Sequence, residues 1–222
     1  MNNIKLNYID NIDSIFKKKE FILSALNLSF LCFFFNKTIT NHKNLIMWPD
    51  GIYGTFLTKS KKIPGSKLIQ NLTLPKNIKN IIVIGNLNIK EKIFLRKKFN
   101  IQIQHKNLPI GKIEDLKKKI FINCSNNDLV LITLPTPKQE EIAQYIFNKF
   151  KVKRIICIGG GLAIASGTIA DVPIFLSKLG IEFLWRLRTD TVRRLKRLFY
   201  TFFVYHYLIF FFISKKLKFI KV

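Results

Sequence analysis

The fold is decided by a strand followed directly by a helix, and this junction lies in the stretch Leu129–Glu141, LVLITLPTPKQEE. Its first six residues, Leu129–Leu134, form a continuous apolar run, which is typical of a strand buried on both faces. Prolines then interrupt the run, and Lys138–Phe150 has the pattern of a helix. A buried strand that leads directly into a helix predicts one unit of a parallel α/β sheet.

The same alternation of apolar runs and helix-like stretches extends in both directions along the chain. Further helices are expected at Lys90–Phe99 and Ile113–Lys119. The sequence therefore predicts an α/β domain with a mainly parallel sheet over residues 1–180. The other expected strands are Phe21–Leu26, Leu45–Trp48, Ile81–Ile84, Ile101–Gln104 and Arg154–Ile158.

Composition limits the function classes. The chain has 222 residues, 48% of them hydrophobic, and a net charge of +25. That length suits one domain with a real core, and that hydrophobic content excludes global disorder. The charge indicates either a polyanionic partner or a lysine-rich solvated surface, and both interpretations remain open.

Cysteines and other metal-ligating residues are dispersed. Cys32, Cys124 and Cys157 lie far apart without zinc spacing, so free thiols in a reducing compartment are expected. The sequence has no Asp-x-Asp pair and no His-Glu-x-x-His motif, so neither a metal nor another cofactor is expected. The N-terminus has no signal-peptide pattern, which favours a location on the cytoplasmic side.

The loops that follow the strands are where ligands of parallel sheets bind. They read WPDGIYG, KIPGSKL, GNLN, PTPKQEE and GGGLAIASG, and glycines there permit close approach of backbone to a ligand. The sequence contains neither the dinucleotide-binding G-x-G-x-x-G motif nor the Walker motif. Each loop is either a structural turn or part of a binding site.

Asp50 has two interpretations. Asp-Gly is a turn signal, so Asp50 is either a turn residue or a general base that accepts the proton of a substrate hydroxyl.

Residues 181–222 differ in composition and are expected to form a helical appendage. The segment Leu179–Tyr200 holds five of the seven arginines, and Arg186, Arg193 and Arg197 are spaced to converge on one site. Arginine forks bind phosphate oxygens, so the three arginines either stabilise a departing diphosphate or form a basic strip at a membrane.

The apolar run Leu198–Ile213 follows these arginines. As a helix it is about 24 Å long, which is short for a membrane core of about 30 Å. We expect residues 198–222 to lie on a membrane surface, with a full span or a core or oligomer contact as alternatives. An exposed apolar tail also favours homo-oligomers when no membrane is present.

Together these motifs resemble the WecG/TagA/CpsF glycosyltransferase family from about Phe21 to Arg197, in the same order. The resemblance covers FILSALN, WPDGIYG, KIPGSKL, PTPKQEE and the stretch GGGLAIASGTIADVPIFLSKLGIEFLWRLRTDTVRRLKR. It implies a Rossmann-like fold with helices on both faces of the sheet. It also implies an inverting, metal-independent transferase that moves an N-acetylmannosamine-type sugar from a UDP donor to an undecaprenyl-diphosphate-linked acceptor.

Site residues follow from the resemblance. Asp50 matches the base, and Arg186, Arg193 and Arg197 match an appendage that reaches over the site. Substrate and nucleotide contacts are expected from the loops at Asn27, Gly51, Gly85, Pro137, Gln139, Gly159 and Gly160, and from Glu182 in the appendage.

The sequence also departs from the family pattern. Ala25, Pro135, Ala163 and Asp171 replace the usual Thr, Gly, Asp and Arg, so a catalytically degenerate relative is an alternative. A basic nucleic-acid-binding protein is the rival from another class, but the sequence has no RNP, KH or helix-turn-helix pattern, so nucleic acid is not expected as a partner.

Overall fold

A computed structural model describes residues 4–109, 111–173, 175–176, 185 and 217–222. Within these residues, all strands belong to one parallel sheet in the order β5-β4-β6-β7-β2-β3-β1-β8. The α/β class and the parallel sheet are therefore confirmed. The strands are β1 (Ile4–Tyr8), β2 (Phe21–Leu26), β3 (Leu45–Pro49), β4 (Asn80–Ile84), β5 (Gln102–Lys106), β6 (Asp128–Ile132), β7 (Arg154–Cys157) and β8 (Leu217–Lys221).

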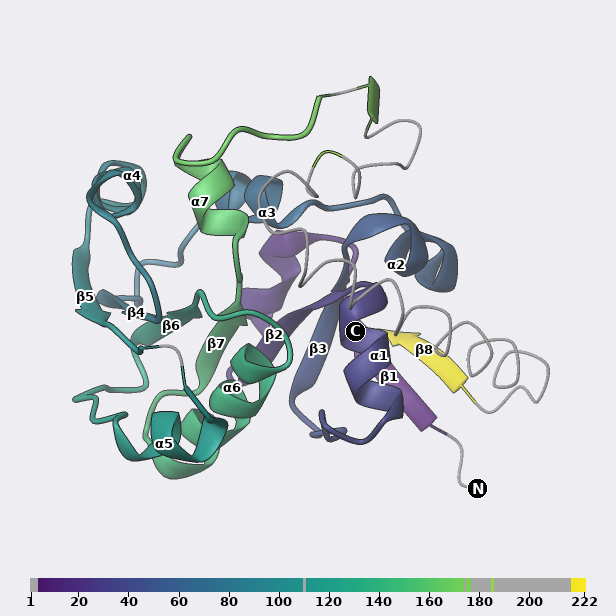
Figure 1. Cartoon of the computed structure of the whole chain (residues 1–222), viewed down its shortest axis with the longest axis horizontal. Helices are drawn as coiled ribbons and strands as arrows, with labels where there is room; N and C mark the ends of the chain where they lie inside the picture. The colour runs from purple at the N-terminus through teal and green to yellow at the C-terminus, as the bar shows by residue number, and fades with distance from the viewer. Residues whose placement is uncertain (1–3, 110, 174, 177–184, 186–216) are drawn as a thin grey trace.

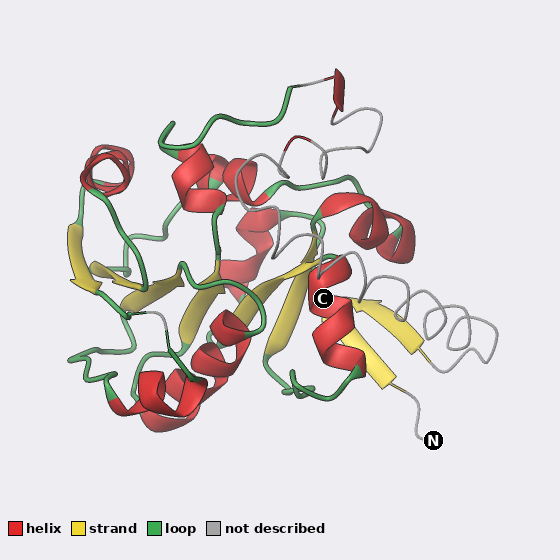
Figure 2. Cartoon of the chain, viewed as in Figure 1, coloured by secondary structure: helices red, strands yellow, loops and turns green. Residues whose placement is uncertain are grey.

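Helices cover both faces of this sheet (Figures 1 and 2). The described helices are η1 (Ile12–Lys17), α1 (Leu28–Phe35), α2 (Gly51–Thr58), α3 (Gly65–Asn71), α4 (Ile89–Phe99), α5 (Ile113–Lys118), α6 (Lys138–Lys149) and α7 (Gly161–Ala165).

The core has two layers because consecutive strand residues point to opposite faces. Ile22 and Leu26 of β2 pack in one layer with α1, α5 and α6, whereas Phe21, Leu23 and Ala25 pack in the other with α3, α4 and α7. All six residues of β2 are buried. Burial on both faces explains why the central strands read as continuous apolar runs.

The sequence prediction missed two strands at one edge of the sheet. Ile4–Tyr8 forms β1, and Leu217–Lys221 forms β8, which pairs with β1 in parallel. The prediction of a helical appendage over residues 181–222 is wrong for Leu217–Lys221, which form a strand. Exposed and partly buried residues are mixed along β8, as in an edge strand. An ion pair between Lys221 and Asp10 also joins this strand to the start of the chain.

The chain changes direction at the carboxyl ends of β2 and β7, which are neighbours in the sheet. The loop after β2 leads to α1 on one face, whereas the loop after β7 leads to α7 on the other face. Loops that diverge in this way leave a crevice above the strand ends, which is where ligands bind in open α/β sheets.

Candidate functional site

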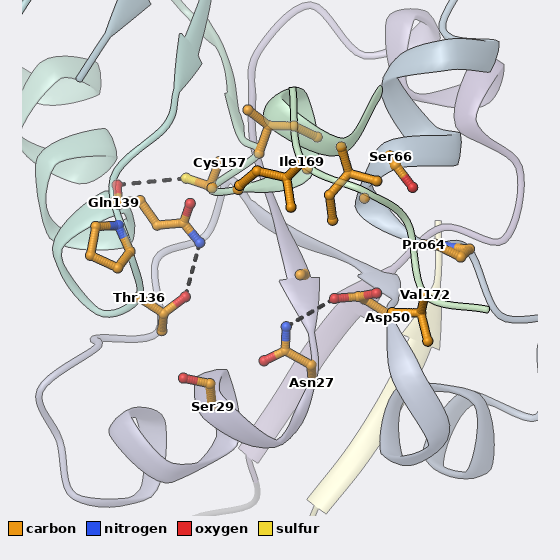
Figure 3. Close-up of a pocket in the computed structure, with 18 of the residues that line it drawn as sticks. Asn27, Ser29, Asp50, Pro64, Ser66, Thr136, Gln139, Cys157, Ile169 and Val172 are labelled. Atoms are coloured by element: carbon orange, nitrogen blue, oxygen red, sulfur yellow. Dashed lines mark hydrogen bonds between the residues drawn. The ribbon is translucent and has the colours of Figure 1, made fainter. Parts of the chain in front are cut away.

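A cavity of about 380 Å³ lies at this crevice. Its volume is within the range of ligand sites in proteins, roughly 300–1,000 Å³. Its wall is built from the carboxyl ends of β2, β3 and β7 and from the segments that follow β2, β3, β6 and β7 (Figure 3). The lining residues include Ala25, Asn27, Ser29, Trp48, Asp50, Pro64, Ser66, Pro135, Thr136, Gln139, Cys157, Gly159 and Gly160.

Asp50 and Asn27 form a hydrogen-bonded pair in this wall. Asn27 Nδ2 donates to Asp50 Oδ2 at 3.0 Å, and Asn27 Oδ1 accepts from the backbone N–H of Phe30 at 3.0 Å. The second bond caps α1 and fixes the orientation of the Asn27 amide, so that its NH₂ group must point toward Asp50. The two side chains point toward one another across the strand ends (Figure 3). A carboxylate held by a fixed donor beside a cavity is suited to accept a proton from a bound hydroxyl.

Helix α2 brings Asp50 to this position. Asp50 is the N-cap residue of α2, and its backbone N–H donates to Leu26 O at 3.2 Å. Gly51 has a φ of +77°, a conformation that favours glycine, and it lets the chain turn from β3 into the helix. A Cβ on Gly54 would lie 2.2 Å from Leu26 O, so only glycine allows α2 to pack this closely against the end of β2.

Three buried polar atoms of the cavity wall have no hydrogen-bond partner among the described residues. They are Ser29 Oγ, Trp48 Nε1 and Gln139 Oε1. Trp48 is 1% exposed and Gln139 is 4% exposed, so bulk solvent does not reach them freely. Buried polar groups in native proteins are almost always paired with protein, water or ligand. The cavity wall therefore offers two groups that can donate a hydrogen bond and one amide oxygen that can accept one, to water or to a polar ligand.

Cys157 also lines the cavity but is not suited to nucleophilic chemistry. Burial raises the pKa of its thiol well above the ordinary value, and the neighbouring Glu140 raises it further. Its Sγ donates to Gln139 O at 3.6 Å. The thiol is therefore a neutral wall group, as expected of a structural buried cysteine.

The family model described as "Glycosyl transferase WecG/TagA/CpsF family" matches residues 10–218. The chain belongs to this family. The match covers most of the chain and confirms the resemblance seen in the sequence. A search of curated proteins finds no match.

In this glycosyltransferase, the structure brings together five of the expected site residues. Asn27, Asp50, Gln139, Gly159 and Gly160 line one cavity, although they come from three loops and the first turn of α6. The pattern of glycines and polar residues after successive strands had indicated this edge of the sheet.

The remaining expected residues are placed differently. Gly51 and Pro137 adjoin lining residues without lining the cavity themselves, and Gly85 lies beside Thr133 at the end of β4. Glu182, Arg186, Arg193 and Arg197 lie outside the described residues. Of the departures from the family pattern, Ala25 and Pro135 line the cavity, whereas Ala163 and Asp171 do not.

Sequence reasoning assigned no individual role to four residues that line the cavity, namely Ser29, Trp48, Ser66 and Thr136. It also missed the helix glycine Gly54, which packs against the end of β2 outside the cavity. Trp48 ends the expected strand Leu45–Trp48 and begins the WPDGIYG loop, but no individual role was assigned to it. The second glycine of the DGIYG motif was the available signal for Gly54, since a glycine inside a helix indicates close packing.

Two further searches concern metals and membranes. Across the described ranges, no group of three or more His, Cys, Asp or Glu side chains could hold a metal ion. Among the helices that the structure describes, none has both the length and the apolar character needed to cross a bilayer. The run Leu198–Ile213 is not among these helices, because it lies outside the described residues.

Proposed function

We propose that this glycosyltransferase is an inverting enzyme that uses a UDP-activated N-acetylhexosamine, either N-acetylmannosamine or its uronate. Its acceptor would be a sugar linked to undecaprenyl diphosphate, in the synthesis of a cell-surface polysaccharide or teichoic acid. One observation carries the proposal: the Asp50 carboxylate is held by Asn27 at the wall of a cavity whose lining includes polar groups without a hydrogen-bond partner in the part of the chain that the structure describes. Family membership supports the glycosyl-transfer chemistry.

Asp50 would act as the general base. It would take the proton of the acceptor hydroxyl, whose oxygen attacks the anomeric carbon of the donor sugar. As the new bond forms, the bond from that carbon to the diphosphate oxygen breaks, and UDP leaves with the electron pair. Attack on the face opposite the leaving group inverts the configuration at the anomeric carbon. General bases of this kind contribute about 10²–10⁴-fold to the rate.

The leaving diphosphate needs positive charge or hydrogen-bond donors. We propose that Arg186, Arg193 and Arg197 supply this charge, because guanidinium groups bind phosphate oxygens with two parallel hydrogen bonds. The dipole of α6, which begins beside the cavity at Lys138, also favours an anion near its N-terminus. In this scheme the enzyme needs no metal, since the arginines provide the electrostatic stabilisation.

We further propose that the enzyme works at the cytoplasmic face of the membrane, where a polyprenyl-linked acceptor is held. The run Leu198–Ile213 contains no Asp, Glu, Lys or Arg, and basic residues flank it on both sides. Such a segment suits a surface of anionic lipid. The same segment favours homo-oligomers in the absence of lipid.

A donor screen tests the proposal. The full-length enzyme is incubated with a short-chain lipid-diphosphate–sugar acceptor and, in separate reactions, with UDP-N-acetylmannosamine, UDP-N-acetylmannosaminuronate, UDP-N-acetylglucosamine or UDP-glucose. Mass spectrometry should show addition of one N-acetylmannosamine or one of its uronates, with inverted configuration by NMR. Transfer of plain glucose alone, or no transfer from any donor, would contradict the proposal and favour a degenerate relative.

A further inference from the structure

Glu140 is a buried carboxyl group directly behind the cavity wall. It is 0% exposed, and its Oε1 atom accepts three hydrogen bonds: from Ser24 Oγ at 2.7 Å, from Gln139 Nε2 at 2.8 Å and from Thr136 Oγ1 at 3.1 Å. These donors come from β2, from α6 and from the loop between β6 and α6. Burying such a group is costly, and these three hydrogen bonds offset part of the cost.

Gln139 is the neighbour that links this carboxyl group to the cavity. Its Nε2 atom donates both to Thr136 Oγ1 at 2.9 Å and to Glu140 Oε1 at 2.8 Å. Thr136 Oγ1 donates in turn to Glu140 Oε1, so the three side chains form a closed ring of hydrogen bonds. Figure 3 shows the contact between Gln139 and Thr136 beside the cavity.

The ring decides which way the Gln139 amide faces. If the amide were reversed, its carbonyl oxygen would face Glu140 Oε1, which already accepts two other hydrogen bonds. A neutral Glu140 would carry its proton on Oε2, which has no partner among the described residues, so Oε1 accepts in either protonation state and two acceptors would lie at hydrogen-bond distance. In the observed orientation the Gln139 NH₂ group points to the ring of hydrogen bonds. The other end of the amide, Oε1, is buried in a side chain that lines the cavity and has no hydrogen-bond partner among the described residues. Gln139 therefore presents a fixed acceptor to whatever occupies the cavity.

We propose that Glu140 is a positioning residue: it locks the Gln139 amide so that the cavity selects a substrate group with a hydrogen-bond donor, an N–H or O–H of the bound nucleotide sugar. This inference rests on the proposed function for the identity of the substrate, but the orientation of Gln139 can be tested without it. A fixed acceptor rejects a carbonyl or phosphate oxygen at the same point, since two acceptors repel each other.

The competing explanation is that Glu140 only braces β2 against α6. A brace would change the stability of the fold, and its loss would lower transfer independently of Gln139. A positioning residue acts through Gln139, so its effect should vanish once the Gln139 side chain has been removed.

A double-mutant cycle on the full-length chain separates these explanations. With UDP-N-acetylmannosamine as donor, Gln139→Ala and Glu140→Leu should each lower kcat/KM about tenfold, the loss expected for one fixed hydrogen bond. The double variant should fall no further than Gln139→Ala alone. Glu140→Gln should recover most of the rate, because its side-chain oxygen still accepts from the same donors. Losses that multiply in the double variant would overturn the proposal.

A second readout needs no substrate. The side-chain amide signal of Gln139 in ¹H–¹⁵N spectra is identified by its loss in Gln139→Ala. It should be protected from hydrogen exchange in wild type and in Glu140→Gln, and should exchange at a solvent-like rate in Glu140→Leu. If Glu140→Leu does not fold, Glu140→Met, which is close to glutamate in length but has no acceptor oxygen, should show the same loss of protection. Unchanged protection in the folded variant would overturn the proposal, whereas absence of transfer with wild type would count only against the proposed function.

Discussion

The buried carboxyl group of Glu140 predicts a pH dependence of stability that a single substitution should remove. Burial raises the pKa of Glu140 from 4.5 to about 7, and hydrogen bonds from Ser24, Gln139 and Thr136 offset part of this rise. In the unfolded chain the group loses its proton near pH 4.5, whereas in the folded protein it keeps the proton until about pH 7. Between these values folding takes up a proton, so the free energy of unfolding falls as the pH rises.

The size of the effect follows from the two pKa values. One pKa unit corresponds to about 1.4 kcal/mol, so the interval from 4.5 to about 7 gives a loss of about 3 kcal/mol. The loss is absent below pH 4.5, grows through the interval and is complete above about pH 7. Glu140→Gln has no ionisable group at this position, so its stability should lack this contribution.

Urea unfolding of wild type and Glu140→Gln in steps from about pH 4.5 to 8 measures the effect. The difference between the two unfolding free energies is used because other titrating groups cancel in it. The variant also carries a buried amide NH₂ group, which adds an offset that does not depend on pH. We expect the difference to shift by about 3 kcal/mol in favour of the variant as the pH rises, and to level off above pH 7. A difference that stays constant across this range would refute the reasoning.

Three further predictions concern α2, the Asn27–Asp50 pair and the apolar tail. Gly54→Ala should lower the unfolding free energy, measured with urea, by about 2–3 kcal/mol, because its Cβ would lie 2.2 Å from Leu26 O. The control is Gly160→Ala, whose Cβ meets nothing within 4 Å and which should change the unfolding free energy by less than about 0.5 kcal/mol. Asn27→Ala and Asn88→Ala each remove a helix N-cap, so each should lower the unfolding free energy by about 1 kcal/mol. Only Asn27→Ala should also lower the transfer rate, by about tenfold, because Asn27 lines the cavity and Asn88 does not. Replacing the phenylalanines of Leu198–Ile213 with serine should release the protein from anionic liposomes in a sedimentation assay while β8 stays intact.

Each of these predictions has a contradicting outcome. Equal stabilities of Gly54→Ala and Gly160→Ala would show that α2 does not depend on the close approach at Gly54. Equal transfer rates of the two asparagine variants would show that Asn27 has no role in sugar transfer. Unchanged sedimentation of the serine variant with liposomes would show that the run Leu198–Ile213 is not needed for membrane binding.

The central sheet could be predicted from the sequence because its strands are buried on both faces. The expected strand Phe21–Leu26 coincides with β2, and the expected helix Lys138–Phe150 differs from α6 by one residue. Such strands read as uninterrupted apolar runs, and no tertiary information is needed to find them.

The edge of the sheet was not predictable in the same way. β8, LKFIK, is the edge strand, and β1, IKLNY, lies between it and β3; each contains lysine because residues at this end of the sheet are partly open to solvent. The pairing of these strands joins the two ends of the chain, and no local pattern indicates such a contact. Helix α1, LSFLCFFF, is apolar almost throughout and therefore has no helical periodicity that could be recognised.

The site was predictable where its residues follow strand ends, and not where it depends on distant contacts. Asp50 and Asn27 were both expected at the site, but the 3.0 Å bond between them joins two loops and could not be read from the sequence. Glu140 is the clearest omission, since a glutamate near the start of a helix normally faces solvent. Its burial arises from packing against Ser24, which is 116 residues away in the chain.

The most direct test of the central claim is the transfer rate of Asp50→Asn with a lipid-diphosphate–sugar acceptor. Asparagine can keep the hydrogen bond from Asn27 through its side-chain oxygen, but it does not accept a proton. We predict that the rate falls by about 10² or more, while UDP binding and the unfolding free energy stay at wild-type values. A turnover within about twofold of wild type would show that Asp50 is not the base and would contradict the account.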